Sequence, residues 1–307
     1  MKIKLMTAFS GGPHKWGLDL VRGLYDHDIE AVQVMNRYSM MLNMLFQPGV
    51  DIVHSTVPFL FKLWHKPLVV TIKGDYTIED NIYQKYYPYL IKQADVVTTP
   101  SEYMKDKINV PDAIVIPNAI YPDTIVPVVH RHKGIVSIAT IMNFYFKGKA
   151  EGTVHLKQLM DSAQLQGVRH IVVGDGPYLQ TMKHMIDTNG STRFSGLLHD
   201  SGLVLGNSDI FLYYSYHDNF PNVILEAMAY GLPVLTNKVG AVSEIITNGY
   251  DGFVAENDDE YIDIMKELIS NVELREKIGK NARKSIEEKF NWNTIINQYI
   301  DIYGRFN

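Results

Sequence analysis

Short hydrophobic runs alternate with amphipathic segments along the whole chain. The runs are rich in valine and isoleucine and predict β-strands, whereas the segments between them carry the spacing of helices. Nearly continuous hydrophobic strands are typical of parallel sheets that helices cover on both faces. The pattern therefore predicts an α/β protein built from Rossmann-like, doubly wound parallel sheets. The predicted strands are residues 2–7, 31–35, 51–54, 68–72, 96–99 and 113–116, followed by 135–139, 170–173, 210–213, 234–236 and 252–255.

The hydrophobic pattern is interrupted over residues 117–133. This stretch contains three prolines, shows no helical periodicity and ends in a polar run. We predict a domain boundary here, with an N-terminal domain over residues 1–127, a C-terminal domain over 128–290 and a further helix over 291–307. Two doubly wound domains that face each other bind ligands outside the carboxyl ends of their strands. The loops that follow the strands should therefore carry the chemistry.

The composition excludes several classes of protein. The 307 residues, 46% hydrophobic and 21% charged, are typical of a globular chain of about two domains. The net charge of -5 argues against nucleic acid as a partner, because phosphates are held by positive charge. The lack of cysteine excludes disulfides and thiol catalysis. No hydrophobic run is long enough to predict a membrane span or a signal peptide, so we expect a cytoplasmic protein.

The usual nucleotide and metal motifs are absent from the sequence. Gly174 and Gly176 follow a predicted strand, but the third glycine of a dinucleotide fingerprint is missing. His54 ends another strand, where it serves either as a ligand or acid–base group, or as a hydrogen-bonding residue of the core. No histidines and carboxylates cluster with metal-ligand spacing, so we predict neither a bound metal nor a cofactor.

The most informative segment runs over residues 208–257. A strand ends here in a polar loop, and the proline at the end of that loop suits the first turn of a helix. The amides at the start of this helix, near Asn222 and Val223, suit a phosphate group. Glu226 follows about one turn later. Its carboxylate either accepts hydrogen bonds from two adjacent hydroxyls, as on a ribose, or lies on the helix surface without a ligand.

Residues 226–234, with the sequence EAMAYGLPV, closely resemble part of the signature of the family-four retaining glycosyltransferases, the glycosyl transferases group 1. That signature has two glutamates separated by seven residues. Glu226 matches the second, and Asp218 stands at the first. Further segments that resemble the family are residues 11–12, 51–54, 99–103, 116–119, 147–148, 174–177, 194–196, 240–246 and 249–253. The resemblance covers most of the chain and implies the glycosyltransferase-B fold, in which the C-terminal helix, here containing Trp292, crosses back to the first domain.

The resemblance also implies a function. A hexose or N-acetylhexosamine would pass from a nucleotide diphosphate sugar, with a UDP-sugar as the expected donor, to a glycan, lipid-linked or small-molecule acceptor of polysaccharide biosynthesis. The anomeric configuration would be retained, and no metal would be needed. Glu226 would bind the ribose, and Lys147 would neutralise the departing diphosphate. The expected catalytic residues are Asp218, Lys147 and Lys73, and substrate contacts are expected from Gly11, Gly12, His54, Gly174, Gly176, Asn219, Phe220, Asn222, Val223 and Glu226.

Three positions depart from the family pattern. Asp218 is one methylene shorter than the usual glutamate. Thr140 aligns best with an arginine that shares the diphosphate, and threonine cannot form a bidentate contact with phosphate. Lys73 replaces a histidine and either adds positive charge to the cleft or is a solvated loop lysine. These departures leave two other hypotheses open: a non-catalytic sugar-nucleotide-binding or accessory subunit of a glycosylation complex, and an inverting or epimerising enzyme of related fold.

Two segments of the N-terminal domain, residues 39–46 and 58–64, are rich in bulky hydrophobic side chains. Basic residues flank the second segment. It therefore either lies peripherally on the inner face of a membrane, where a lipid-linked acceptor would be met, or packs as a core helix.

Overall fold

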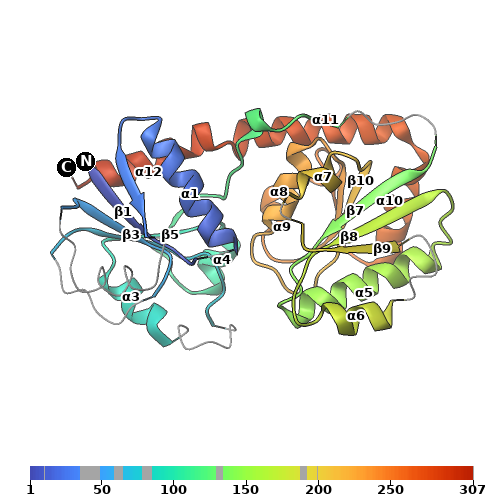
Figure 1. Ribbon diagram of the computed structural model, residues 1–307, viewed down its shortest axis with the longest axis horizontal. Coiled ribbons are helices and arrows are strands. Elements are labelled where there is room, and N and C mark those ends of the chain that lie inside the picture. Colours follow the sequence, from blue (N-terminus) through green and yellow to red (C-terminus); the bar gives the residue numbers. More distant parts are fainter. Residues whose placement is uncertain are drawn as a thin grey trace. The chain divides into compact units, whose positions relative to one another are not determined.

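The structure, a computed structural model, consists of two compact units (Figure 1). It describes residues 1–9, 11–34, 49–58, 65–77, 85–128, 134–186, 192–198 and 200–306. The first unit comprises Met1–Ala119 together with Phe290–Asn307, and the second comprises Ile120–Lys289. The C-terminal segment thus returns to the first unit. The boundary predicted at residue 127 falls within the second unit.

Contacts of the backbone explain why the proline-containing segment joins the second unit. The guanidinium of Arg283 donates to the carbonyl oxygens of Pro122 and Ile125, at 2.9 and 3.1 Å. The amide of Val128 donates to the carbonyl of Tyr230 at 2.7 Å. The prolines predict irregular structure in this segment. They do not predict which unit the segment joins, because its hydrogen-bond partners lie more than 100 residues away along the chain.

The described part of the first unit contains a parallel sheet of six strands in the order β2-β1-β3-β4-β5-β6. Every strand predicted from the hydrophobic runs of this half is present. The strands β3 and β4 are buried at every position, which explains why their sequences are hydrophobic without alternation. The strands are β1 (Lys2–Met6), β2 (Glu30–Gln33), β3 (Ile52–Ser55), β4 (Leu68–Thr71), β5 (Val96–Thr99) and β6 (Ile114–Val115).

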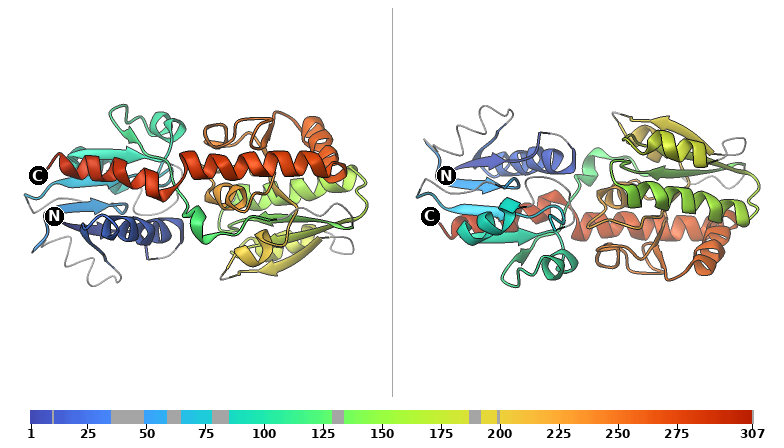
Figure 2. Two further views of the ribbon diagram at one scale, coloured as in Figure 1. Left: turned by 90° about the horizontal axis from the view of Figure 1, so that it is seen from above. Right: turned by 90° about the horizontal axis from the view of Figure 1, so that it is seen from below.

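Helices α1 (Gly11–Tyr25) and α12 (Trp292–Gly304) lie side by side on one face of this sheet (Figure 2). The buried residues of α12 recur every three or four positions, so one stripe of the helix faces the unit. Asn291 caps α12 by accepting a hydrogen bond from the amide of Asn293. Helix α3 (Tyr87–Gln93) lies on the other side of the sheet, and α4 (Glu102–Lys107) follows β5. The crossing of the C-terminal helix to the first unit, which the resemblance implied, is confirmed.

The described part of the second unit has a parallel sheet in the order β12-β11-β10-β7-β8-β9. Its strands are β7 (Val136–Ile141), β8 (Val168–Val173), β9 (Thr192–Gly196), β10 (Ile210–Tyr213), β11 (Val234–Asn237) and β12 (Phe253–Ala255). Its helices are η2 (Pro122–Thr124), α5 (Lys147–Ser162), α6 (Leu179–Met185), α7 (Gly202–Leu205), α8 (Asn222–Ala229), α9 (Val242–Ile245), α10 (Asp258–Ser270) and α11 (Val272–Lys289). All the predicted strands are present, while β9 was indicated only by the family resemblance.

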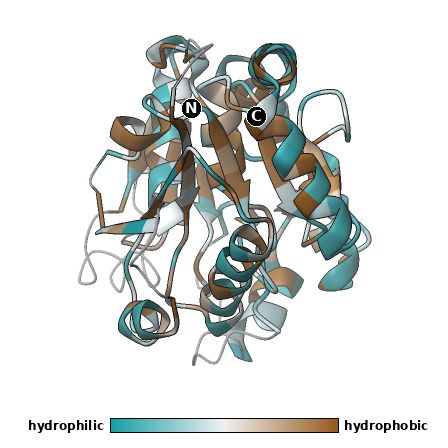
Figure 3. Ribbon diagram, turned by 90° about the vertical axis from the view of Figure 1, so that its right-hand side faces the viewer, coloured by the Kyte–Doolittle hydropathy of each residue, from teal (hydrophilic) through white to brown (hydrophobic). Residues whose placement is uncertain are grey.

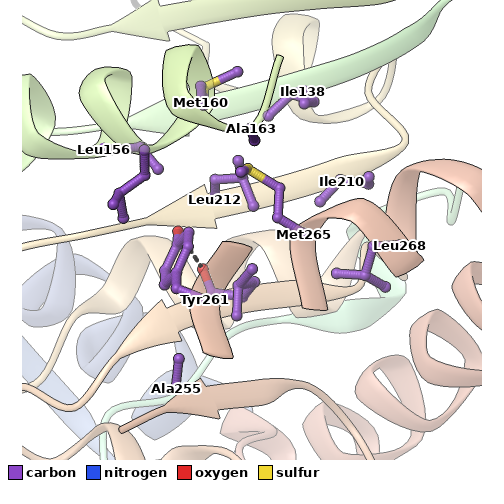
Figure 4. Close-up of a cluster of buried hydrophobic side chains, with 12 residues drawn as sticks. Ile138, Leu156, Met160, Ala163, Ile210, Leu212, Ala255, Tyr261, Met265 and Leu268 are labelled. Atoms are coloured by element: carbon purple, nitrogen blue, oxygen red, sulfur yellow. Dashed lines mark hydrogen bonds between the residues drawn. The ribbon is translucent and has the colours of Figure 1, made fainter. Parts of the chain in front are cut away.

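The core of the second unit lies between the sheet and helices α5 and α10 (Figure 4). Leu156 and Met160 of α5 meet Ile210 and Leu212 of β10 in this cluster, and Met265 of α10 completes it. Each such side chain contributes about 1.5–3 kcal/mol by leaving water. Hydrophobic colour runs along the strands in Figure 3, and hydrophilic colour covers much of the surrounding helices. Among the described residues, no helix is both long enough and apolar enough to cross a bilayer.

The strand orders identify where a ligand would bind in each unit. The chain extends its sheet to one side of β7 and then returns to place β10 on the other side. In the first unit the order reverses at β1, because β2 lies on one side of β1 and β3 lies on the other. Loops diverge at the carboxyl ends of strands where the order reverses, and this divergence opens a crevice. The loops after β7 and β10 are therefore the first place to look for a site in the second unit.

Candidate functional site

The start of helix α5 is packed closely against the loop after β10. Two glycines one turn apart make this approach possible. A Cβ on Gly152 would lie 2.4 Å from the carbonyl oxygen of Tyr214, and one on Gly148 would lie 3.1 Å from the Cβ of His217. The amide of Tyr216 donates to the carbonyl of Gly148 at 3.2 Å. The first turn of α5 is thus fixed beside the residues that precede Asp218.

This packing brings Lys149 onto Asp218. The ammonium Nζ of Lys149 lies 2.6 Å from Oδ2 of Asp218, and the two side chains are only 16% and 10% exposed. The hydroxyl of Tyr213 donates to the same Oδ2, and the amide of Asn219 donates to Oδ1 at 2.8 Å. Burial and the neighbouring Asp218 charge raise the pKa of Tyr213 well above its ordinary value, so the phenol keeps its proton. The sequence analysis did not identify Lys149, and only its place in the first turn of the helix that Lys147 begins could have indicated it.

The loop from Asp218 to the start of α8 is held by a second loop. Gly240 has a positive φ of 56°, and a Cβ there would lie 2.5 Å from the carbonyl oxygen of Asp218. The amide of Ala241 donates to the carbonyl of Asn219 at 2.8 Å. Phe220, the next residue along the chain after Asn219, is also buried, with 7% of its surface exposed. The loop therefore has little freedom, which is a requirement for a site that orients a substrate.

Helix α8 begins at Asn222, directly after this loop. Pro221 stands at the position before the helix with φ of −72° and ψ of 97°, and its carbonyl accepts from the amide of Ile224 at 3.0 Å. The first amides of a helix have no partner within the helix and carry partial positive charge, and Asn222 and Val223 supply them here. Glu226 follows one turn later, and its Oε2 accepts from the hydroxyl of Ser201 at 3.2 Å.

Lys147 is the first residue of α5 and differs sharply from Lys149. Its side chain is 71% exposed, and its Nζ lies 3.4 Å from Oε1 of Glu151, which is itself half exposed. An exposed ion pair of this kind contributes only about 0.3–0.5 kcal/mol, so it competes weakly with a ligand. Lys147 is therefore available to an incoming anion at the same loop cluster, while Lys149 is engaged on Asp218.

Gly174 and Gly176 have a packing role in the loop after β8. Their φ angles are 146° and 148°, and a Cβ on them would lie 1.9 Å from the carbonyl oxygen of Met142 and 2.3 Å from the carbonyl carbon of Phe144. Only glycine fits such an approach of two backbones. Their predicted contact with substrate stays a prediction. Thr140 is fully buried within the sheet, where it donates to the carbonyl of Leu212 at 2.8 Å.

Among the predicted residues of the first unit, His54 lies deep in the core. Its Nδ1 is 2.6 Å from the hydroxyl of Tyr303 on α12, and its Nε2 is 2.7 Å from the hydroxyl of Thr71 on β4. Burial, helped by the charge of Lys73, lowers the pKa of His54 to about 3. The sequence left two roles open for His54, as a ligand or acid–base group and as a hydrogen-bonding residue of the core. These contacts agree with the second role. Both ring nitrogens already have protein partners, so substrate binding by His54 has no support here.

Lys73 follows β4 at the carboxyl end of the sheet and is half-buried. Its Nζ donates to Oδ1 of Asn118 at 2.6 Å and lies 4.0 Å from the centre of the Trp16 ring. Within the described ranges it forms no ion pair with a carboxylate. Burial lowers the pKa of Lys73 well below its ordinary value, and a bound anion would favour the charged form. This side chain is therefore suited to an anionic ligand.

Gly11 and Gly12 begin helix α1 after β1. Gly11 has a positive φ of 74°, and a Cβ there would meet no atom within 4 Å, so the backbone conformation alone favours glycine. The hydrophobic segment 39–46 lies outside the described residues, as does the segment 58–64 apart from Pro58, so the choice between a membrane contact and a core helix for the second segment stays a prediction. In the part of the chain that the structure describes, no three histidines or carboxylates gather as a metal site would require.

Comparison with known proteins gives this arrangement a family. The model of the glycosyl transferases group 1 family matches residues 144–285, which include α5, the loop after β10 and α8. The matched segment is thus similar to that family, and it makes up somewhat less than half of the chain. The resemblance seen in the sequence motifs is thereby confirmed, and the site residues predicted for the second unit, from Lys147 to Glu226, lie within the matched segment.

Relatives and solved structures extend the likeness. The chain is 33% identical over 138 residues to N-acetyl-alpha-D-glucosaminyl L-malate synthase of Bacillus anthracis, an alignment that spans 43% of this chain and 36% of that protein. It is 24% identical over 279 residues to an uncharacterized glycosyltransferase of Methanocaldococcus jannaschii, spanning 84% and 76% of the two chains. The structure of HepE from Anabaena, in complex with UDP and glucose, superposes with a TM-score of 0.78 at 16% identity, covering 99% and 100% of the chains. The predicted glycosyltransferase-B fold is thus confirmed.

Proposed function

We propose that this protein is a glycosyltransferase that moves a sugar from a nucleotide diphosphate sugar to a glycan, lipid-linked or small-molecule acceptor. A UDP-sugar is the proposed donor, and the proposed sugar is a hexose or N-acetylhexosamine. The group 1 match over residues 144–285 supports the reaction class. The UDP bound by HepE and the N-acetylglucosaminyl group in the name of the Bacillus relative support the proposed donor.

The start of α8 is the observation that carries the proposal. Asp218 stands just before the helix, the amides of Asn222 and Val223 open it, and Glu226 lies one turn inside it. Negative charge develops on the diphosphate as the bond to the sugar breaks, and preformed amides and a cation stabilise that charge. Lys147 is the exposed cation beside this loop. Glu226 is proposed to accept hydrogen bonds from the two ribose hydroxyls of the donor.

The proposal includes roles for the first unit. Lys73 is proposed as a further catalytic cation, and Gly11 and Gly12 as backbone contacts to the substrates. Retention of the anomeric configuration and independence from metal are also proposed, since lysines and helix amides can supply the positive field that leaving-group departure needs. Peripheral contact with a membrane stays a proposal for the acceptor side.

The test is a panel of UDP-, GDP- and ADP-sugars offered with candidate acceptors, with release of the nucleotide diphosphate as the readout. Turnover of a UDP-sugar, unchanged by EDTA, is the expected result. Nuclear magnetic resonance of the product should give the anomeric configuration of the donor. An inverted or epimerised product would indicate the related enzyme classes. Tight binding of a nucleotide sugar without turnover under any condition would indicate an accessory subunit. It would refute the proposal that the protein is an enzyme.

A further inference from the structure

The carboxylate of Asp218 is oriented by three donors from the protein. Its Oδ2 accepts from the ammonium of Lys149 and the hydroxyl of Tyr213, and its Oδ1 accepts from the amide of Asn219. A carboxylate oxygen accepts about two hydrogen bonds. Both directions of Oδ2 are therefore used, whereas Oδ1 keeps one direction that no described residue takes.

We propose that Lys149 is a positioning residue for Asp218, holding its carboxylate so that the unused direction of Oδ1 accepts a hydroxyl of the transferred sugar. This inference rests on the proposed function, because it requires a nucleotide-sugar donor. Tyr213 assists by donating to Oδ2 from the buried end of β10. Lys149 itself acts through Asp218 and does not touch the donor.

Burial and packing fit this role better than direct contact with the diphosphate. The side chain of Lys149 is 16% exposed and its Nζ is 2.6 Å from Asp218, whereas that of Lys147 is 71% exposed. The glycines at 148 and 152 fix the helix turn that carries Lys149. In a largely buried ion pair, removing one partner leaves the charge of the other uncompensated. Loss of the Lys149 ammonium would therefore disturb the position of the Asp218 carboxylate.

The length of the aspartate agrees with its partners. A glutamate at position 218 would carry its carboxylate about 1.5 Å further from the backbone, the length of one carbon–carbon bond. The backbone of this residue cannot retreat to compensate, because Gly240 is already packed against its carbonyl oxygen. The departure from glutamate to Asp218 and the presence of Lys149 are therefore parts of one arrangement.

The experiment compares two ligands, UDP and UDP-glucose, or the guanosine or adenosine pair if the panel above selects it. Binding is measured by calorimetry, and kcat and KM are measured for the nucleotide sugar. For Lys149→Met we expect the Kd for UDP to stay within twofold of wild type. We expect kcat/KM for the nucleotide sugar to fall about tenfold to a hundredfold, since a misplaced group lowers the rate of reaction by such factors.

Three further variants separate this role from others. Lys149→Arg should recover part of the lost kcat/KM because it restores a cation on Oδ2. Tyr213→Phe should give the same pattern with a smaller loss, and it provides an independent reading if Lys149→Met folds poorly. Lys284→Met removes an exposed lysine that pairs with Glu288 on α11, and it should match wild type in both measurements.

The outcomes are distinct. An equal loss of UDP and UDP-sugar binding in Lys149→Met would mean direct contact with the diphosphate and would overturn the inference. Unchanged kcat/KM in both Lys149→Met and Tyr213→Phe would overturn it as well. Failure of the wild-type protein to bind any nucleotide or nucleotide sugar would instead refute the proposed function, before any variant is compared.

Discussion

Lowering the pH from 7 to 5 should destabilise the first unit through His54. The pKa of this buried imidazole is lowered from its ordinary 6.5 to about 3. Between these values the unfolded chain binds a proton that the folded protein does not. The stabilising effect is therefore fully present above pH 6.5 and is lost progressively as the pH falls toward 3. Each pH unit in this window changes the free energy of unfolding by about 1.4 kcal/mol.

The expected size follows from the part of the window that is crossed. From pH 6.5 to pH 5 the loss is about 2 kcal/mol for one histidine, because 1.5 units are titrated in the unfolded chain. His170 of the second unit has the same lowered pKa of about 3, caused by burial and by the charge of Lys157, and should destabilise its own unit by a similar amount.

Tryptophan fluorescence can isolate the first unit. All three tryptophans, Trp16, Trp64 and Trp292, belong to residues assigned to that unit. Urea unfolding followed by this signal at pH 7 and pH 5 measures the free energy of unfolding at each pH. The difference between the two should be about 2 kcal/mol in favour of pH 7.

A variant at His54 provides the decisive comparison. His54→Gln should lower stability at pH 7 by about 1–3 kcal/mol, because the hydroxyls of Thr71 and Tyr303 lose a well-placed partner. It should also abolish most of the difference between pH 7 and pH 5. His65→Gln, at an exposed position of the same unit, should keep the wild-type difference. If His54→Gln retained the full pH dependence, the assignment of that dependence to the buried imidazole would be wrong.

Three other expectations can be tested directly. Glu226→Gln should lower kcat/KM about tenfold to a hundredfold in steady-state assays, since hydrogen bonds to a charged group contribute about 1.5–3 kcal/mol; unchanged kinetics would remove Glu226 from the donor site. Gly152→Ala should destabilise the second unit by about 1–3 kcal/mol in thermal unfolding, because its Cβ would lie 2.4 Å from the carbonyl oxygen of Tyr214. Gly304→Ala, whose Cβ meets no atom within 4 Å, is the matched control and should be neutral or stabilising. Lys73→Met should lower kcat about tenfold while leaving stability unchanged or higher, because it removes a half-buried lysine that pairs with no carboxylate among the described residues; lower stability with unchanged kcat would make Lys73 structural.

The sequence alone determined the strands of the hydrophobic runs, the parallel sheets and the resemblance of the second unit to the glycosyl transferases group 1. Strands buried on both faces must be hydrophobic at successive positions, and this requirement is visible without a structure. The segment from Asp218 to Glu226 was also readable, because a loop, a helix start and a carboxylate one turn later are close together in the chain. The return of the C-terminal helix to the first unit followed from the resemblance and not from the composition.

Only the tertiary structure decided which side chains meet across the chain. Lys149 and Asp218 are 69 residues apart, and His54 and Tyr303 are 249 residues apart. Local pattern cannot predict such pairs, since they depend on the order of strands and on glycines that let backbones approach. From the sequence, His54 suited either a ligand site or the core. The structure places it in the core, where its ring contacts Thr71 of β4 and Tyr303 of α12. The sequence therefore predicted a site at the loops after the strands, while the packing of α5 onto the loop after β10 determined which lysine contacts Asp218.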